Sequence, residues 1–312
     1  MRWLLLLLVF ATASYADVTR KQTVSSQFMG ASDGTTIEYY SGDLHATEST
    51  MRWTGGLMKT ATGGKPVDSR SIVRLDKQLV WTLNPKDKTY TEMTFAQFRD
   101  MMKKGMAEAK TSGDERPDTV REDMYTWKVE DKSEAAPKLI HGWNCRNVHV
   151  EATGVNKADS LDKVIITLDT WNSPDVPGAK EIADFGLRYF KALDLDQEAL
   201  TPGLQQTSAL YQKQLKELME AAKKAPGEAV QSLMEVKHNQ LKGPNIGKEI
   251  AAGAANELMG KLPFGKKKAP KEEKPEYELK VKFSTTTELT EASTSAADAS
   301  KFEIPAGYKL KK

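Results

Sequence analysis

The chain has 312 residues with 45 basic and 43 acidic side chains, so its formal net charge at pH 7 is only +2. A chain this close to neutral has no net electrostatic attraction to nucleic acid, and we expect no nucleic-acid partner. The single cysteine, Cys145, excludes an intrachain disulfide, cysteine-based zinc sites and CxxC redox chemistry. A domain of this size can bury enough apolar surface to fold without a disulfide.

The first sixteen residues, MRWLLLLLVFATASYA, have the pattern of a secretory signal peptide. Arg2 precedes an apolar run from Trp3 to Phe10, and small residues precede Asp17. This run is shorter than the roughly 20 residues of a membrane-spanning helix, so we expect no transmembrane span after cleavage. No cysteine stands at the cleavage point, which argues against a lipid anchor. We therefore expect an exported protein, periplasmic or secreted, that begins near Asp17.

Short segments of alternating or β-branched residues, separated by turn dipeptides, indicate many strands. Strands joined by such short links are antiparallel neighbours. The segment IVRLDKQLVWTLNPKDKTYTEM predicts a meander of three strands. The predicted strands are Thr35–Tyr40, His45–Trp53, Ser71–Leu75, Leu79–Leu83, Thr89–Met93, Tyr125–Glu130, Asn147–Ala152, Lys163–Trp171 and Tyr277–Leu289.

Helical spacing of apolar residues appears in several other segments. Thr94 begins the segment TFAQFRDMMKKGMAEAK, in which Thr94 and Gln97 form a capping box at the helix start. A second helix is expected over Gly178–Leu193. Further helices are predicted over Thr207–Lys224, Gly227–Leu241 and Ile246–Leu262, followed by the charged linker FGKKKAPKEEKP at 264–275.

These patterns predict an α+β fold that is mainly antiparallel β. Residues 1–16 form the signal peptide, and one β-rich domain comprises residues 17–195 and 276–312. Residues 196–275 form a helical insertion that ends in the charged linker, so the closing strand of the domain follows the insertion.

We predict neither catalytic residues nor a cofactor. No Cys/His signature is present, and the carboxylates are scattered. His141, Cys145 and His149 share strand parity, but four residues along a strand span about 13 Å, too far for one metal ion. We therefore predict no metal site. The glycines of GGLMKTATGG, Gly55–Gly64, lack the setting of a phosphate loop and predict a flexible hairpin.

Tryptophan and methionine gather in the strand-rich region and around the first helix. Methionine adapts to varied apolar shapes, and tryptophans on one face of a curved sheet could line a lipid-sized cavity. An ordinary sheet–helix core would have the same composition. The candidate lining residues are Trp81, Trp127, Trp143, Met101, Met102 and Met106.

The segments SIVRLDKQLVWTLNPKDKTYTEMTF, LIHGWNCRNVHVE and KFEIPAGYK resemble a family of exported bacterial proteins of unassigned function. Members of that family look like distant relatives of the periplasmic lipoprotein carrier and its outer-membrane receptor. The resemblance covers roughly residues 20–195 and 276–311. It implies a strongly curved, incomplete antiparallel β-barrel with helices packed in its mouth. In the carriers, the concave apolar face holds acyl chains.

The leading hypothesis is a non-enzymatic cell-envelope protein that binds a lipid-like or acylated, hydrophobic or amphipathic ligand in a half-barrel. The alternative is an interaction or scaffold protein that contacts an envelope partner through residues 201–274, a long amphipathic segment with few aromatic residues. An enzyme, such as a hydrolase, has the weakest support in the sequence.

Overall fold

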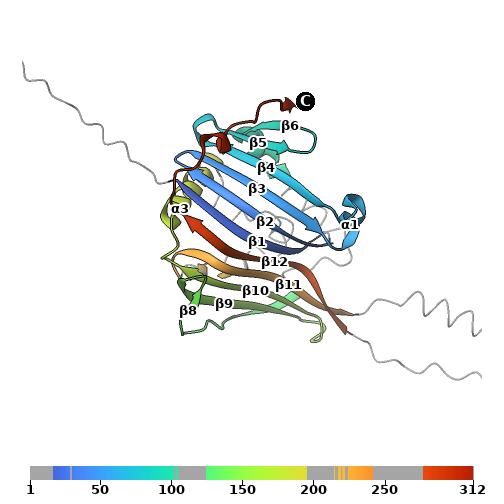
Figure 1. Cartoon of the computed structure of the whole chain (residues 1–312). Coiled ribbons are helices and arrows are strands. Elements are labelled where there is room, and N and C mark those ends of the chain that lie inside the picture. The colour runs from blue at the N-terminus through green and yellow to red at the C-terminus, as the bar shows by residue number, and fades with distance from the viewer. Residues whose placement is uncertain are drawn as a thin grey trace, which may run out of the picture.

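The computed structural model describes residues 17–28, 30–101, 103–104, 124–194, 214, 217–218, 220–221, 224–241 and 277–311. The predicted signal peptide, the helix predicted over Ile246–Leu262 and the linker at 264–275 lie outside these residues. Figure 1 shows how the described elements are arranged.

The fold is mainly antiparallel β, with one large open sheet and helices packed against it (Figure 1). The 13-stranded sheet has the order β13-β6-β5-β4-β3-β2-β1-β12-β11-β10-β9-β7, and β8 pairs with β9 off this path. Its strands are β1 (Val18–Phe28), β2 (Gly30–Ser41), β3 (Leu44–Trp53), β4 (Pro66–Arg74), β5 (Leu79–Asn84), β6 (Thr89–Thr94), β7 (Tyr125–Asp131), β8 (Lys138–Ile140), β9 (Trp143–Asn156), β10 (Lys163–Ser173), β11 (Glu228–Leu241), β12 (Tyr277–Ser293) and β13 (Lys309–Leu310). Among the described strands, the edge strands β13 and β7 do not pair with each other, so the sheet stays open.

The helical elements lie at the ends and on the faces of this sheet. They are α1 (Gly56–Thr62), η1 (Leu75–Lys77), α3 (Ala179–Ala192) and η4 (Ala299–Phe302), together with helical residues at 95–101, 103–104, 214, 217–218 and 220–221. None of the described helices is long and apolar enough to cross a membrane. Figure 1 places α3 at the left end of the strands and α1 at the right end.

Several predictions from sequence are confirmed. Every predicted strand is present, and the meander predicted from its turn dipeptides is β4, β5 and β6, which pair antiparallel in succession. The capping box is also present. The backbone N–H of Gln97 donates to Thr94 Oγ1 at 3.2 Å, and the Thr94 N–H donates to Gln97 Oε1 at 2.9 Å. The helix predicted over Gly178–Leu193 is α3.

The helix predicted over Gly227–Leu241 is wrong, because these residues form strand β11. Met234, Val236 and His238 are buried at alternate positions, and β11 pairs with β10 on one side and β12 on the other. Because two neighbouring strands offer backbone partners, the two-residue period of burial prevails over the helical spacing of the same apolar residues. The segment 196–275 is therefore not a separate helical insertion, since it contributes a central strand.

The hairpin predicted over Gly55–Gly64 needs a similar correction. Strands β3 and β4 do pair antiparallel across this segment, but the link between them contains helix α1 rather than a flexible loop. Gly63 ends the helix with φ of 62°, a left-handed conformation that glycine adopts without the strain of a side chain.

The two faces of the sheet are covered by different parts of the chain. We call one the inner face, where Val18, Tyr40 and Val73 pack with Phe185 of α3. We call the other the outer face, where the C-terminal segment places Phe302 against a cluster formed by Ala46, Ile72, Trp81 and Leu83. No shift interrupts the register from β1 to β6, so alternate residues keep the same face over these strands.

The inner face continues across β12 into the second half of the sheet. Ser26 of β1 shares the parity of Val18 and pairs with Thr285, which pairs in turn with Met234 of β11. Met234 faces Leu168, and the cluster that contains both also contains Leu218 of the helical residues near 214–221. Helical segments therefore cover the inner face at both of its ends.

The C-terminal segment should contribute strongly to stability through Phe302. This ring is only 2% exposed, and removing a buried aromatic side chain leaves a cavity that costs about 3–5 kcal/mol. We expect Phe302→Ala to lower the free energy of unfolding in urea by that amount. Leu310→Ala is the control, because Leu310 is 51% exposed and its loss should cost less than about 0.5 kcal/mol. Equal effects of the two substitutions would contradict this role.

Candidate functional site

A largely buried cluster of charged and polar side chains lies on the inner face, with members from β1, β2 and β3 and one from the start of β11, across β12. The guanidinium of Arg20 donates to the carboxylates of both Glu38 and Glu228. The hydroxyl of Tyr40 donates to Glu38 Oε1 at 3.3 Å, and His45 Nε2 lies 3.3 Å from the same oxygen. The rings of Tyr40 and His45 stack with their centroids 4.3 Å apart. We call these side chains the Arg20 cluster.

The ionisation of the Arg20 cluster follows from its burial and its pairing. Burial alone would raise the pKa of Glu38, but the adjacent Arg20 and His45 outweigh it and lower this pKa to about 2. Burial raises the pKa of Tyr40 well above its usual range. The carboxylates raise the pKa of Arg20 although burial opposes them. Glu38 is therefore a carboxylate at neutral pH, Tyr40 is a neutral phenol, and the positive charge of Arg20 is fully compensated.

Uncharged hydroxyl side chains extend from this cluster across the inner face toward β6. Thr47 faces Ser71, Ser71 faces Thr82, and Thr82 faces Thr91, so one hydroxyl row crosses β3 to β6. A parallel row two residues along each strand joins Thr36 to Ser49 and Ser49 to Ser69. We call these the hydroxyl rows, and they consist of Thr36, Thr47, Ser49, Ser69, Ser71, Thr82 and Thr91.

The hydroxyl rows differ in how far water reaches them. Thr36 is buried, and its Oγ1 lies 3.3 Å from Ser49 Oγ. Ser69, Thr82 and Thr91 are exposed. This part of the inner face is therefore polar and open to solvent at the β4–β6 side.

The other half of the inner face is apolar. We call it the apolar half, and it consists of Val150, Ala152, Val164, Ile166, Leu168, Met234, Val236 and Phe283, all buried. Leu218 and Ala225 pack against it, and Trp127 covers it from the β7 edge. Trp127 lies directly over Gly154, where a Cβ atom would come within 2.9 Å of the indole ring. The close approach of Trp127 thus depends on glycine at this position.

The candidate lining residues that the structure describes are not brought together. Trp127 belongs to the apolar half, whereas Trp143 packs near Cys145 and Trp171 in another cluster. Trp81 lies on the outer face beneath the C-terminal segment, and its Nε1 donates to Glu92 Oε2 at 2.8 Å.

Trp81 is therefore part of the outer core rather than a lining residue of the inner face, because strand alternation turns it away from that face. Met101 is 49% exposed. Met102 and Met106 lie outside the described residues.

His141, Cys145 and His149 each have a separate partner. His141 Nε2 lies 2.7 Å from Glu288, and His149 Nδ1 lies 3.4 Å from Asp169. The thiol of Cys145 donates to the Trp143 carbonyl at 3.4 Å, and burial raises the pKa of this thiol. Within the described part of the chain, no group of three or more such side chains is placed to hold a metal ion.

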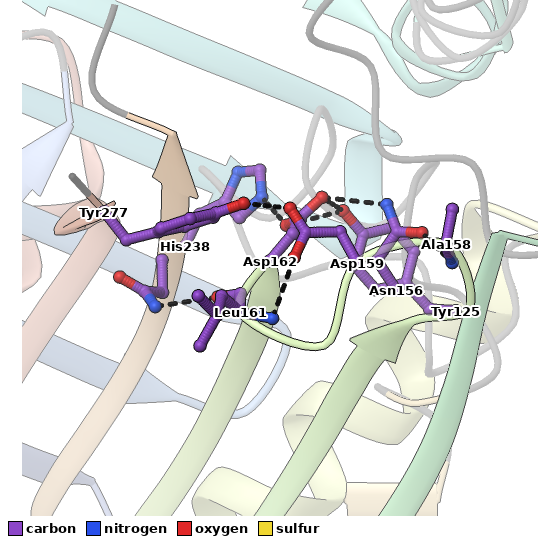
Figure 2. A network of polar contacts seen from close by, with 9 residues as sticks. Tyr125, Asn156, Ala158, Asp159, Leu161, Asp162, His238 and Tyr277 are labelled. Carbon is purple, nitrogen blue, oxygen red and sulfur yellow. Dashed lines mark hydrogen bonds and ion pairs between the residues drawn. The ribbon is translucent and has the colours of Figure 1, made fainter. Parts of the chain in front are cut away.

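A second polar network, drawn in Figure 2, centres on Asp162 at the link between β9 and β10. Tyr125 donates its hydroxyl to both carboxylate oxygens of Asp162, at 3.0 and 2.9 Å. Asn156 Nδ2 donates at 2.9 Å, and His238 Nε2 lies 2.7 Å from Oδ1. Because the carboxylate can only accept, His238 donates from Nε2. One side chain thus joins β7, β9 and β11.

The adjacent Asp159 extends this network to β12 (Figure 2). Asp159 accepts hydrogen bonds from the Tyr277 hydroxyl and, at 3.0 Å, from the Leu161 backbone N–H. The hydrogen bond to Asp159 raises the pKa of Tyr277, and its counterpart lowers the pKa of Asp159. Each acidic side chain is used by neighbouring donors, so the network holds strand ends together rather than presenting a free acid or base.

Sequence reasoning missed both polar clusters. Arg20 and Glu228 are 208 positions apart, and neither lies in a motif. The alternation of polar and apolar residues in β2 and β3 could have indicated that Glu38 and Thr47 share a face, but not which face the helices cover.

A scan against protein-family models finds no match, and searches of curated proteins and of solved structures also find none. The resemblance to the lipoprotein carriers therefore stays an expectation from the sequence.

The low pKa of Glu38 predicts a component of acid unfolding. A carboxyl whose pKa falls from 4.5 to about 2 on folding stabilises the fold above pH 4.5, and this stabilisation is lost as the pH falls toward 2. Between about pH 5 and pH 2, wild type should lose about 3 kcal/mol more than Glu38→Gln. Urea unfolding of both proteins at each pH measures this difference. The other carboxylates are the same in both proteins, so their contributions cancel when the two free energies are subtracted. Parallel pH profiles would contradict the ion pair.

The Asp162 network should behave as one cooperative unit. Asp162→Asn removes the charge that three donors share and should cost about 2 kcal/mol of unfolding free energy. The double variant Asp162→Asn, His238→Ala should lose less unfolding free energy than the sum of the two single losses. The shortfall should be at least about 0.5 kcal/mol, since the two side chains interact directly. Asp87→Asn in an exposed turn is the control, expected to cost less than about 0.5 kcal/mol. Additive losses would show that Asp162 and His238 act independently.

Proposed function

We propose that this protein is an exported, non-enzymatic envelope protein that binds an amphipathic, lipid-like ligand on the inner face of its open sheet. The observation that carries the proposal is the division of that face. Residues of the apolar half line β9–β12, whereas the hydroxyl rows occupy β2–β6. A ligand with an apolar chain and a polar head matches such a division.

The energetics of the apolar half support a binding role. Burial of apolar surface contributes about 25 cal/mol per Å², so an exposed floor of this kind requires a cover. In the described residues that cover includes Leu218, Ala221 and Ala225, which come from the segment between α3 and β11. A ligand chain would replace this cover on the same surface, and helices that pack in the mouth of a half-barrel are what the carrier resemblance implies.

The electrostatics of the inner face favour binding over catalysis. General acid–base catalysis works best when the pKa of the catalytic group lies near the working pH. The pKa values in the Arg20 cluster lie far from neutral pH, because that of Glu38 is lowered to about 2 and that of Tyr40 is raised. Neither Glu38 nor Tyr40 would exchange a proton near neutral pH. A non-enzymatic role is therefore the better match.

Mass spectrometry under native conditions tests the proposal directly. The mature chain is purified from the periplasm of a bacterial host without denaturation, and its mass is compared with the calculated mass. We expect additional mass that extracts into organic solvent as a lipid. A clean apo mass, together with no saturable binding of a fluorescent lipid probe by folded protein, would overturn the proposal.

Two tryptophan substitutions localise the binding. Trp127 covers the apolar half, whereas Trp143 lies in a separate cluster. Trp127→Ala should weaken binding of a fluorescent lipid probe at least about tenfold, because it removes a large apolar contact. Trp143→Ala removes the same side chain elsewhere and should leave the affinity unchanged. An equal loss in both variants, with folding confirmed by circular dichroism, would place binding outside the apolar half.

A further inference from the structure

We propose that the hydroxyl rows bind an uncharged polyhydroxyl head group, so that the ligand is a glycolipid with a neutral sugar head. This inference rests on the proposed function, because it assigns the polar part of the same ligand. The sugar head would lie over β2–β6, and the chain would extend across β1 and β12 onto the apolar half.

The first step is the separation of charge between the faces. Along β1 to β6, Arg20 is the only lysine or arginine at an inner-face position among the described residues. Outer-face positions of the same strands carry charges of both signs, among them Lys21, Asp33, Arg52 and Asp68. A strand face in contact with water commonly carries such a mixture, as the outer-face positions away from the Phe302 cluster do. Uncharged hydroxyls in its place indicate a selected surface.

The second step is the chemistry of the hydroxyl group. Serine and threonine hydroxyls both donate and accept hydrogen bonds, as the hydroxyls of a sugar do. Neighbouring strands lie about 4.8 Å apart, so Thr47, Ser71, Thr82 and Thr91 form a row of such groups at regular intervals. A surface of this kind can exchange its water for ligand hydroxyls without leaving a charge unpaired.

The third step concerns the charge of the head group. Phosphate and carboxylate heads need a cation or several N–H donors. Arg20 already donates to Glu38 and Glu228, and the sum of these three charges is −1. This cluster would repel an anionic head at the end of the hydroxyl rows. A phosphorylated or carboxylated head is therefore disfavoured, and a neutral sugar head fits.

The fourth step is the distance between the two parts of the ligand site. Thr36 of β2 and Met234 of β11 are separated by three strand spacings through β1 and β12, about 14 Å across the strands. Thr36 is level with Gln22, whereas Met234 is level with Ser26, so they also differ by four residues, about 13 Å, along the strands. The two residues are therefore about 20 Å apart. An alkyl chain of ordinary length spans this distance. One amphiphile can therefore place its head on the hydroxyl rows and its chain on the apolar half.

The test is a calorimetric titration of the mature chain with three amphiphiles that share one dodecyl chain. Dodecyl maltoside has a neutral sugar head, dodecylphosphocholine a zwitterionic phosphate head, and dodecanoate an anionic head. All are used below the concentrations at which they form micelles. We expect dodecyl maltoside to bind at least about tenfold more tightly than the others, since only its head matches the hydroxyl rows.

A pair of matched variants assigns this preference to the inner face. Ser71→Ala with Thr82→Val removes two facing hydroxyls of the rows. This double substitution should weaken the binding of dodecyl maltoside at least about fivefold and leave the affinity for dodecanoate unchanged. Thr23→Val with Thr35→Val removes a facing pair on the outer face of β1 and β2 and should change neither affinity. Circular dichroism and thermal unfolding confirm that both variants fold.

The outcomes separate the two proposals. If all three amphiphiles bind equally and Trp127→Ala still weakens their binding, the proposal of a sugar head is wrong, whereas amphiphile binding is supported. Tighter binding of dodecylphosphocholine or dodecanoate would also overturn it. If free maltose binds as tightly as dodecyl maltoside, the glycolipid is wrong, because the chain then adds nothing. Binding of none of the three by folded, ligand-free protein would count against the proposed function itself.

Discussion

The pairing of β12 with β1 on one side and β11 on the other is the constraint on which the rest of the structure depends. Every strand from β13 to β1 lies on one side of β12, and every strand from β11 to β7 lies on the other. Without β12 there would be two smaller sheets, each with an open edge. Arg20 crosses the same junction, because it lies in β1 and donates to Glu228 of β11. The buried ion pair thus locks the relative position of the two halves.

This junction also explains why the inner face is divided. Strands β1–β6 bury their apolar residues under α3 at one end of the inner face and under the C-terminal segment on the outer face. The rest of their inner face can therefore carry hydroxyl side chains. The half after β12 has its main core on the inner face, under Leu218 and Ala225. The two halves therefore bury opposite faces over much of their area. An amphipathic inner surface is the direct consequence of joining them edge to edge.

The sequence predicted the parts of this fold that depend on local signals. Turn dipeptides marked β4, β5 and β6, and the Thr94–Gln97 pair marked a helix start, because both signals act within a few residues. The prediction from sequence failed where strands distant in the chain determine the conformation of a segment. β11 has apolar spacing compatible with a helix, and only β10 and β12 make it a strand. Strand β1 was missed because VTRKQTVSSQF is polar on both faces. Trp81 was assigned the wrong role because strand alternation does not reveal which face the helices cover.

The central place of a late strand has a consequence for how the inner face of the sheet forms. β1 pairs with β12, so Thr19 faces Ser293, and the sheet cannot be completed until nearly the whole chain is present. Contacts this distant in sequence must overcome a large loop-closure entropy before they stabilise the fold. The hydroxyl rows belong to β2–β6, which pair locally, whereas their junction with the apolar half requires β12. A surface that joins polar and apolar parts therefore exists only in the completed fold. The ion pair between Arg20 and Glu228 also forms only then, because its two members lie on opposite sides of β12.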